Sequence, residues 1–248
     1  MKLGIIGAMH QEVDRLIELM HCEKQTVLGM RTFYEGNLFG MQVVLVFSRW
    51  GKVAAATTAT QLIVSFGVDV VLFTGIAGGL SHNITIGDVV IGDKLFQHDM
   101  DASPLMPRFE IPLSKKSYFE SSVDLKEKAY IAVRSFLSNE TAFLAQLQDF
   151  GIKHPKVWVG DIASGDQFIH TQAQRQAIIT NLPSVLCVEM EGAAVAQVCY
   201  DYAIPFLVIR VISDTADDAS VVDFPVFLEQ LASKYAFFIL KNVFSLLH

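Results

Sequence analysis

The sequence has few cysteines, little charge and no long uninterrupted hydrophobic run. Three cysteines in 248 residues are too few for a disulfide framework, which favours a reducing compartment. Charged residues make up 18% of the chain, the net charge is −7 and no basic run occurs, so a nucleic-acid backbone is a poor partner. The most apolar region, residues 53–80, is interrupted by Gln61, Gly67 and Asp69 and does not predict a membrane span. We therefore expect a cytoplasmic protein that binds small molecules or another protein.

Short apolar runs alternate with segments of helical periodicity along the whole chain. Strands are predicted at residues 3–7, 29–37, 41–48, 70–74, 84–92, 157–163, 185–189 and 207–212. Helices are predicted at residues 9–20, 52–66, 123–149, 171–180, 191–202 and 224–247. The alternation predicts one α/β domain over residues 1–248, with a mixed, largely parallel central sheet flanked by helices.

Polar or glycine-rich residues follow most of the predicted strands, where ligands of α/β proteins gather. They are Glu12, residues 74–79, residues 164–166, Glu189, Glu191, Ser213 and Asp214. Several have ordinary explanations, since TGIAGGL at 74–80 fits a tight strand-to-helix turn and Asp214 fits a helix cap. Glu189 and Glu191 are harder to explain, because the period of a strand turns both to one face where the sheet ends. Burying several unpaired carboxylates is costly, so their convergence indicates a functional site.

A carboxylate set favours glycosyl chemistry here, because the sequence has no Cys/His metal-ligand cluster, no nucleophilic Ser or Cys and no phosphate-binding loop. Cleavage of a glycosidic bond needs an acid at the leaving group, a base that activates water and an anion near the sugar hydroxyls. Asp214, Glu12 and one of the pair Glu189 and Glu191 can take these roles.

A series of motifs covers nearly the whole chain. They are GIIGAMxxEV at 4–13, GKVAAA at 51–56, TGxAGGL at 74–80, HDxDAS at 98–103, SGDQFI at 164–169, VEMEGAAVAQVC at 188–199 and RxISDxAD at 210–217. In these motifs and their order the sequence resembles the 5′-methylthioadenosine/S-adenosylhomocysteine nucleosidases of the purine nucleoside phosphorylase superfamily. The resemblance implies a nucleoside phosphorylase-like fold, a homodimer and a reaction without metal or cofactor.

The resemblance also implies roles for individual positions. Glu12 matches the general base that activates water, and Asp214 matches the acid that protonates adenine N7. Asp214 must then hold its proton near neutral pH. Glu191 matches the carboxylate that binds the ribose hydroxyls, and Met190 matches the residue under the ribose.

Further positions are expected around the substrate. Phe168 and Ile169 match the pair that stacks on adenine and reads it, while Ser213 and Arg210 match supporting residues. The remaining residues that we expect to contact substrate are Met9, Trp50, Ile76, Ala77, Gly78 and Glu189. The proline-rich segment 98–119 matches a loop that lends apolar residues to the 5′-substituent pocket of the neighbouring subunit.

The sequence departs from the family pattern beside the expected ribose. Ile76 stands where many relatives carry Ser or Thr, and Arg49 with Trp50 stand in a segment that commonly reads SGIGK. These departures leave the 5′-substituent open, and aminodeoxyfutalosine is an alternative substrate. A phosphorylase that uses Arg49 and Arg210 as its anion site is a second alternative, although Ile76 removes a hydroxyl and Glu12 repels phosphate. A nucleoside-binding protein without catalysis is a third.

Overall fold

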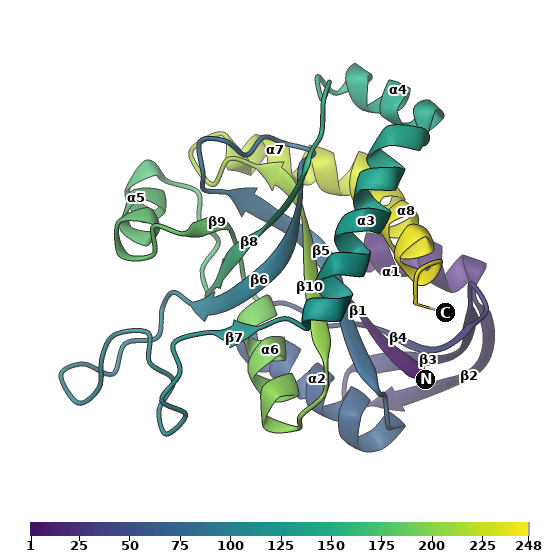
Figure 1. Ribbon diagram of the computed structural model, residues 1–248, viewed down its shortest axis with the longest axis horizontal. Helices are drawn as coiled ribbons and strands as arrows, with labels where there is room; N and C mark the ends of the chain where they lie inside the picture. The colour runs from purple at the N-terminus through teal and green to yellow at the C-terminus, as the bar shows by residue number, and fades with distance from the viewer. Residues whose placement is uncertain (248) are drawn as a thin grey trace.

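One ten-stranded mixed sheet forms the centre of the part of the chain that the computed structural model describes, residues 1–247 (Figure 1). The strands are β1 (Lys2–Gly7), β2 (His21–Leu28), β3 (Arg31–Leu38), β4 (Met41–Phe47), β5 (Val70–Gly79), β6 (Val89–Gln97), β7 (Phe119–Glu120), β8 (Val157–Ser164), β9 (Val185–Glu189) and β10 (Phe206–Asp214). The predicted single α/β domain with a mixed sheet is confirmed. The sheet is not largely parallel, however, because five of the ten strand pairings within residues 1–247 are antiparallel.

Strand β5 pairs with three other strands of this sheet. It pairs in parallel with β1 and β10 and antiparallel with β9, and the path β10-β6-β8-β9 then returns to β5, so these five strands close on themselves. Strands β1, β4, β3 and β2 extend the sheet on the other side of β5. Because β1, β5 and β10 run in parallel, their carboxyl ends meet at one edge.

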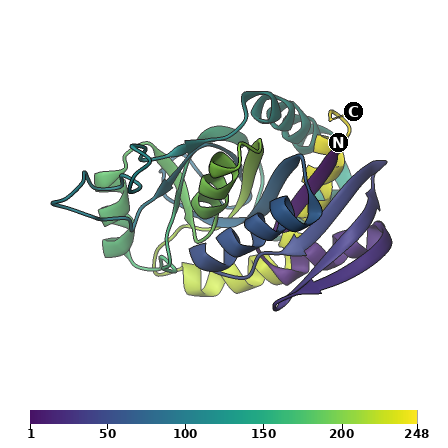
Figure 2. The ribbon, with the colours of Figure 1, turned by 90° about the horizontal axis from the view of Figure 1, so that it is seen from below.

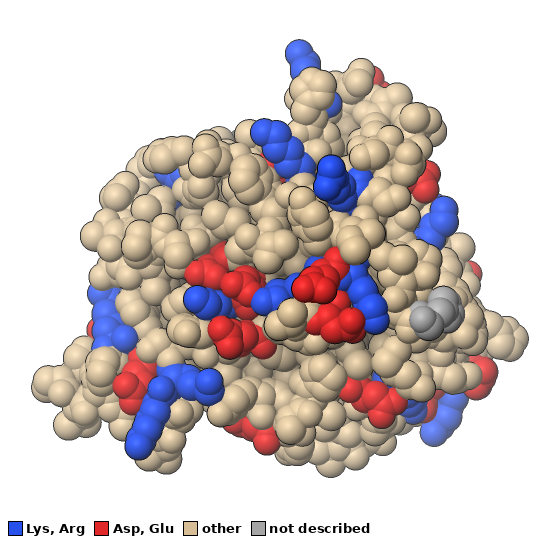
Figure 3. All heavy atoms as spheres, viewed as in Figure 1, with Lys and Arg blue, Asp and Glu red and all other residues tan. Residues whose placement is uncertain are grey.

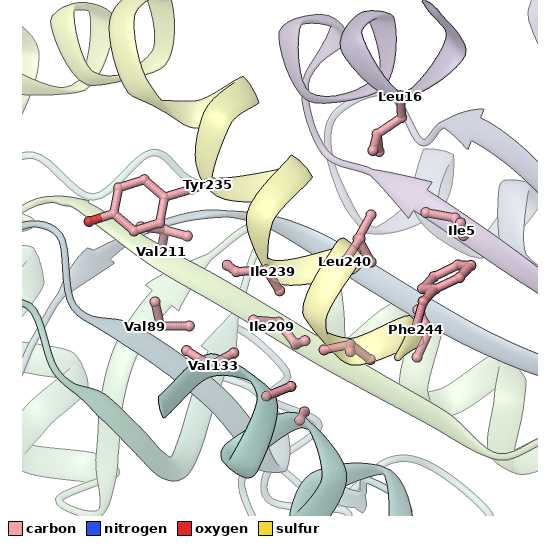
Figure 4. Close-up of a cluster of buried hydrophobic side chains, with 14 of the residues drawn as sticks. Ile5, Leu16, Val89, Val133, Ile209, Val211, Tyr235, Ile239, Leu240 and Phe244 are labelled. Atoms are coloured by element: carbon pink, nitrogen blue, oxygen red, sulfur yellow. The ribbon is translucent and has the colours of Figure 1, made fainter. Parts of the chain in front are cut away.

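Helices cover both faces of the sheet (Figures 1 and 2). They are α1 (His10–Leu19), α2 (Lys52–Phe66), α3 (Val123–Asn139), α4 (Thr141–Asp149), α5 (Gln172–Asn181), α6 (Gly192–Asp201), α7 (Ser220–Phe227) and α8 (Ser233–Phe244). Successive residues of a strand point to opposite faces of the sheet. Ile5 packs in the cluster that includes α1, α3 and α8, whereas Ile6 packs in the cluster that includes α2 and α6. In Figure 4, Val89 and Ile209 lie between Val133 of α3 and Ile239 of α8. Burial on both faces explains the nearly continuous apolar runs of these strands.

Several predicted boundaries change. Strand β5 continues through residues 75–79, so the glycine-rich segment is strand and not the turn that we expected. Its glycines permit close packing: a Cβ at Gly75 would lie 2.7 Å from the Cβ of Ala8, and one at Gly78 would lie 3.0 Å from Oδ1 of Asp214. Strand β6 spans Val89–Gln97 and not residues 84–92.

Other differences lie outside the central strands. Strand β2 was not predicted, because most of its residues are exposed and carry no apolar alternation. The predicted helix at residues 123–149 divides at Glu140 into α3 and α4. The closing helix begins earlier than expected, as α7, and joins α8 through a π-helical turn at Leu228–Ala232.

The surface adds two features. The segment 98–118 projects from the body of the molecule in both ribbon views (Figures 1 and 2). On the face shown in Figure 3, acidic and basic side chains of the described residues are interspersed.

Within residues 1–247, no helix combines the length and the apolar character needed to cross a membrane.

Candidate active site

A cavity of about 380 Å³ opens at the carboxyl ends of the central strands. Residues of four strands or strand ends line it: Ala8 and Met9 after β1, residues 76–78 in β5, residues 188–191 at the end of β9, and residues 213–214 at the end of β10. The cavity therefore contains the expected Met9, Ile76, Ala77, Gly78, Glu189, Met190, Glu191, Ser213 and Asp214.

Aromatic side chains form the outer wall of the cavity. Phe168 and Phe224 make an edge-to-face pair with ring centroids 5.4 Å apart, and both line the cavity. Phe168 is 41% exposed and Trp50 is 63% exposed, so neither ring is held by the core. Ile169 lines the same cavity beside Phe168. The structure thus offers open aromatic and apolar surface next to the buried acids.

Asp214 lies at the end of β10, is 2% exposed and lines the cavity. Its Oδ2 accepts a hydrogen bond of 2.7 Å from the hydroxyl of Ser213. Its Oδ1 accepts one of 2.6 Å from the hydroxyl of Ser220 and one of 2.9 Å from the backbone N–H of Ala216. These contacts fix the orientation of the carboxyl group at the cavity wall.

Glu191 directly precedes α6, lines the cavity and is 5% exposed. Its Oε1 accepts a hydrogen bond of 2.9 Å from the backbone N–H of Gly51 at the start of α2. Burial raises the pKa of Glu191, and the nearby charge of Glu189 raises it further. Gly51 has φ +88, and a Cβ there would lie 2.9 Å from Oδ1 of Asp166, so this close approach of α2 requires glycine.

Glu12 lies immediately behind the cavity wall and is not one of its lining residues. The side chain is 1% exposed, and one oxygen accepts a hydrogen bond of 3.0 Å from the backbone N–H of Met9. Burial raises the pKa of Glu12 from 4.5 to about 8, although nearby Arg210 acts to lower it. The charge of Glu191 also raises this pKa.

Glu189 and Glu191 both line the cavity, but they differ in their partners, because β9 ends at Glu189 and Glu191 directly precedes α6. Glu189 forms a buried ion pair with Arg210, with its Oε2 2.5 Å from Nη2. Its oxygens also accept hydrogen bonds from the hydroxyl of Ser164 and the backbone N–H of Gly192. The carboxylate of Glu189 is thus fully engaged within the protein, although the residue lines the cavity.

The two arginines that the phosphorylase hypothesis requires are unsuited to a shared anion site in this cavity. Arg210 is fully buried, and its guanidinium is paired with Glu189 and stacks over the ring of Phe73 at 4.0 Å. Arg49 lines a different, neighbouring cavity. Trp50, in contrast, lines the main cavity.

Comparison with known proteins identifies the family. Residues 2–245 match the model of the phosphorylase superfamily. The chain belongs to this superfamily. It is 38% identical to the 5′-methylthioadenosine/S-adenosylhomocysteine nucleosidase of Shewanella putrefaciens over 225 residues, and this alignment covers 90% of each chain. It is 34% identical to the aminodeoxyfutalosine nucleosidase of Helicobacter pylori over 243 residues, and this alignment covers 98% of each chain.

A solved structure gives the same result. The 5′-methylthioadenosine/S-adenosylhomocysteine nucleosidase of Colwellia psychrerythraea, in complex with adenine, superposes with a TM-score of 0.88 at 34% identity. The match covers 100% of this chain and 96% of that one. The chain is therefore a nucleosidase, and the resemblance noted from its motifs is confirmed.

Sequence reasoning missed part of the nucleosidase cavity. Gln167, Ser220, Phe224 and Pro225 also line it, and the last three come from α7. The apolar residues of α7 have the spacing of a helix that packs on the core. The local sequence therefore does not distinguish residues that line the cavity from residues that belong to the core. Within residues 1–247, no group of three or more His, Cys, Asp or Glu side chains is placed to hold a metal ion.

Proposed function

We propose that this nucleosidase hydrolyses the N-glycosidic bond of 5′-methylthioadenosine and S-adenosylhomocysteine, releasing adenine and a 5′-substituted ribose. The observation that carries the proposal is the gathering of Glu12, Glu191 and Asp214, all at most 5% exposed, around one cavity with open aromatic surface. The relative from Shewanella putrefaciens, whose name states this activity, supports the choice of substrates.

Asp214 acts at the adenine end of the cavity. Phe168 stacks on the purine and Ile169 contacts it, while the carboxyl group of Asp214 donates its proton to N7. The hydroxyls of Ser213 and Ser220 hold this carboxyl group in place. Protonation lets adenine leave as a neutral molecule when the bond between N9 and C1′ breaks.

Glu191 and Glu12 act at the ribose end. Glu191 binds the 2′ and 3′ hydroxyls, and Met190 packs under the ring. Glu12 accepts a proton from the water whose oxygen bonds to C1′, and its raised pKa of about 8 suits a general base that acts near neutral pH. Acid and base each contribute about 10²–10⁴-fold to the rate.

Three features favour hydrolysis over phosphorolysis. A phosphate dianion needs unpaired cationic or hydroxyl donors, but Arg210 is paired with Glu189 and Ile76 offers no hydroxyl. Negative charge on Glu12 or Glu191 would also repel phosphate. Water, in contrast, needs only the base.

We also propose a homodimer in which the loop 98–119 completes the partner's 5′-substituent pocket. In the single chain Leu105 is 89% exposed and Leu113 is 94% exposed on this projecting loop. Apolar side chains held this far from the core are typical of an interface. Sedimentation equilibrium of the wild type should give twice the chain mass, and a Leu105→Asp variant should shift toward a monomer.

Aminodeoxyfutalosine is a second candidate substrate, because the relative from Helicobacter pylori named for it matches 98% of both chains. The decisive assay incubates the protein with 5′-methylthioadenosine, S-adenosylhomocysteine, aminodeoxyfutalosine and adenosine, each with and without phosphate. Adenine and a free 5′-substituted ribose, independent of phosphate, support the proposal and rank the substrates. A sugar 1-phosphate formed only with phosphate overturns it, as does turnover of aminodeoxyfutalosine alone.

A further inference from the structure

Lys52, the first residue of α2, forms a partly buried ion pair with Asp99 outside the catalytic cavity. The Nζ atom of Lys52 lies 2.6 Å from Oδ1 of Asp99, and the two side chains are 15% and 22% exposed. The same Nζ atom donates a hydrogen bond of 3.1 Å to Oε1 of Gln97 at the end of β6. Neither Lys52 nor Asp99 lines the catalytic cavity, so the proposed reaction uses neither side chain directly.

Asp166 connects this ion pair to the segment that carries Phe168. Its Oδ1 accepts a hydrogen bond of 2.8 Å from the backbone N–H of Lys52, and its own backbone N–H donates one of 2.9 Å to Oδ2 of Asp99. These two bonds hold the backbone from which the ring of Phe168 projects, two residues further on. The residue Phe168 is 41% exposed at the cavity wall, so its position depends on this backbone more than on the core.

The residue before Lys52 connects the same ion pair to Glu191. The backbone N–H of Gly51 donates a hydrogen bond of 2.9 Å to Oε1 of Glu191. Two consecutive N–H groups at the start of α2 therefore bind two carboxylates, that of Glu191 and that of Asp166. The start of α2 thus joins the acid of the proposed ribose site to the segment of the proposed adenine site.

Asp99 is charged and both of its oxygens are in use. Although burial acts to raise the pKa of Asp99, the hydrogen bonds from Lys52 and from the backbone of Asp166 hold this pKa below its usual value. Oδ1 accepts from Lys52 and Oδ2 accepts from Asp166. Without the cation of Lys52, Oδ1 would lose its charged partner at a partly buried position, and the carboxylate would be free to turn away from Asp166.

We propose that Lys52 and Asp99 are positioning residues of this nucleosidase. They set the separation between the carboxylate of Glu191, at the ribose, and the ring of Phe168, at the adenine. The inference rests on the proposed function, because it takes the roles of Glu191 and Phe168 from it. Both groups hold the substrate before and during cleavage of the bond, so their displacement raises KM and leaves kcat little changed.

The test measures kcat and KM for 5′-methylthioadenosine and, by calorimetry, the Kd of adenine. Lys52→Met removes the cation but keeps the backbone N–H that binds Asp166. We expect KM and the Kd of adenine each to rise by about 10-fold, the lower end of the worth of a charge-assisted hydrogen bond. Adenine has no ribose, so its Kd reports the position of Phe168 alone, whereas KM reports both ends of the site. Lys52→Arg should restore most of the affinity, because it returns the charge.

Lys126→Met is the matched control. Lys126 of α3 pairs with Asp93 of β6, its side chain is 16% exposed, and neither residue lines the cavity. Both Lys→Met variants remove one cation from a partly buried ion pair, so urea unfolding should show similar losses of stability. Only Lys52→Met should change KM and the affinity for adenine.

Asp99→Asn is the second variant, and it decides the question if Lys52→Met does not fold. It should raise KM by a similar factor, and the double variant should be no weaker than the weaker single variant, because all three break one ion pair. Effects that multiply in the double variant overturn the inference.

A folded Lys52→Met variant with the KM and the adenine affinity of the wild type also overturns the inference. So does one that changes no more than Lys126→Met, or one that loses kcat at an unchanged KM. Failure of the proposed function would show differently, as no phosphate-independent release of adenine from 5′-methylthioadenosine by the wild type.

Discussion

Replacing Glu12 by Gln should change how the stability of the nucleosidase depends on pH. Gln keeps the size of the side chain and can still accept the hydrogen bond from the backbone N–H of Met9. What the substitution removes is a buried carboxyl group that must lose its proton as the pH rises. The variant therefore isolates the free energy of burying the charge of Glu12.

The magnitude follows from the pKa in the two states. In the folded chain the pKa of Glu12 is about 8, compared with 4.5 for a solvated glutamate. Because the folded-state pKa is raised, the stability from this group is fully present below pH 4.5 and is lost as the pH rises to about 8. Each pKa unit is worth about 1.4 kcal/mol, so the total loss is about 5 kcal/mol. A neutral Gln does not incur this loss.

Urea unfolding of the wild type and Glu12→Gln between about pH 4 and pH 9 measures the effect. The stability difference in favour of the variant should grow by about 1.4 kcal/mol per pH unit above pH 4.5 and level off near pH 8. By thermal unfolding, the full effect corresponds to a relative gain of roughly 10–20 °C. Glu18→Gln, on the exposed side of the same helix, controls for the loss of one negative charge. A difference that is flat or shrinks with rising pH refutes the burial argument.

Three further predictions concern the catalytic and structural carboxylates. Asp214→Asn should lower kcat by at least about 100-fold while calorimetry still detects adenine binding, and an active variant contradicts the acid role. In the wild type, kcat/KM for 5′-methylthioadenosine should rise with pH up to about 8, as Glu12 loses its proton, and a plateau already reached below about pH 6 contradicts the base role. Arg210→Met should lower the free energy of unfolding by about 3–5 kcal/mol, because it leaves Glu189 buried without its partner. The double variant with Glu189→Gln should recover part of that loss, and additive losses in urea unfolding would count against the pair.

Elements with a strong local signal were predicted well. The apolar run before Glu12 forms β1, the Ala/Thr-rich segment forms α2 with the predicted bounds Lys52–Phe66, and β9 spans the predicted residues 185–189. In each case the pattern of apolar residues matches the period of one type of element. Strand β2 and the far end of β5 lack such a pattern. They are strands because neighbouring strands supply the hydrogen bonds, a contribution that no local window contains.

The sequence by itself determined the α/β class, the family and the set of acidic residues at strand ends, because apolar period and motif order are properties of the chain alone. Only the tertiary structure decided what each charged side chain faces. It paired Glu189 with Arg210, placed Glu12 behind the wall and turned Arg49 into a neighbouring cavity. Beyond the end of a strand, the side chains no longer alternate regularly between the two faces of the sheet. The partner of each side chain there depends on the distant segment that packs against it.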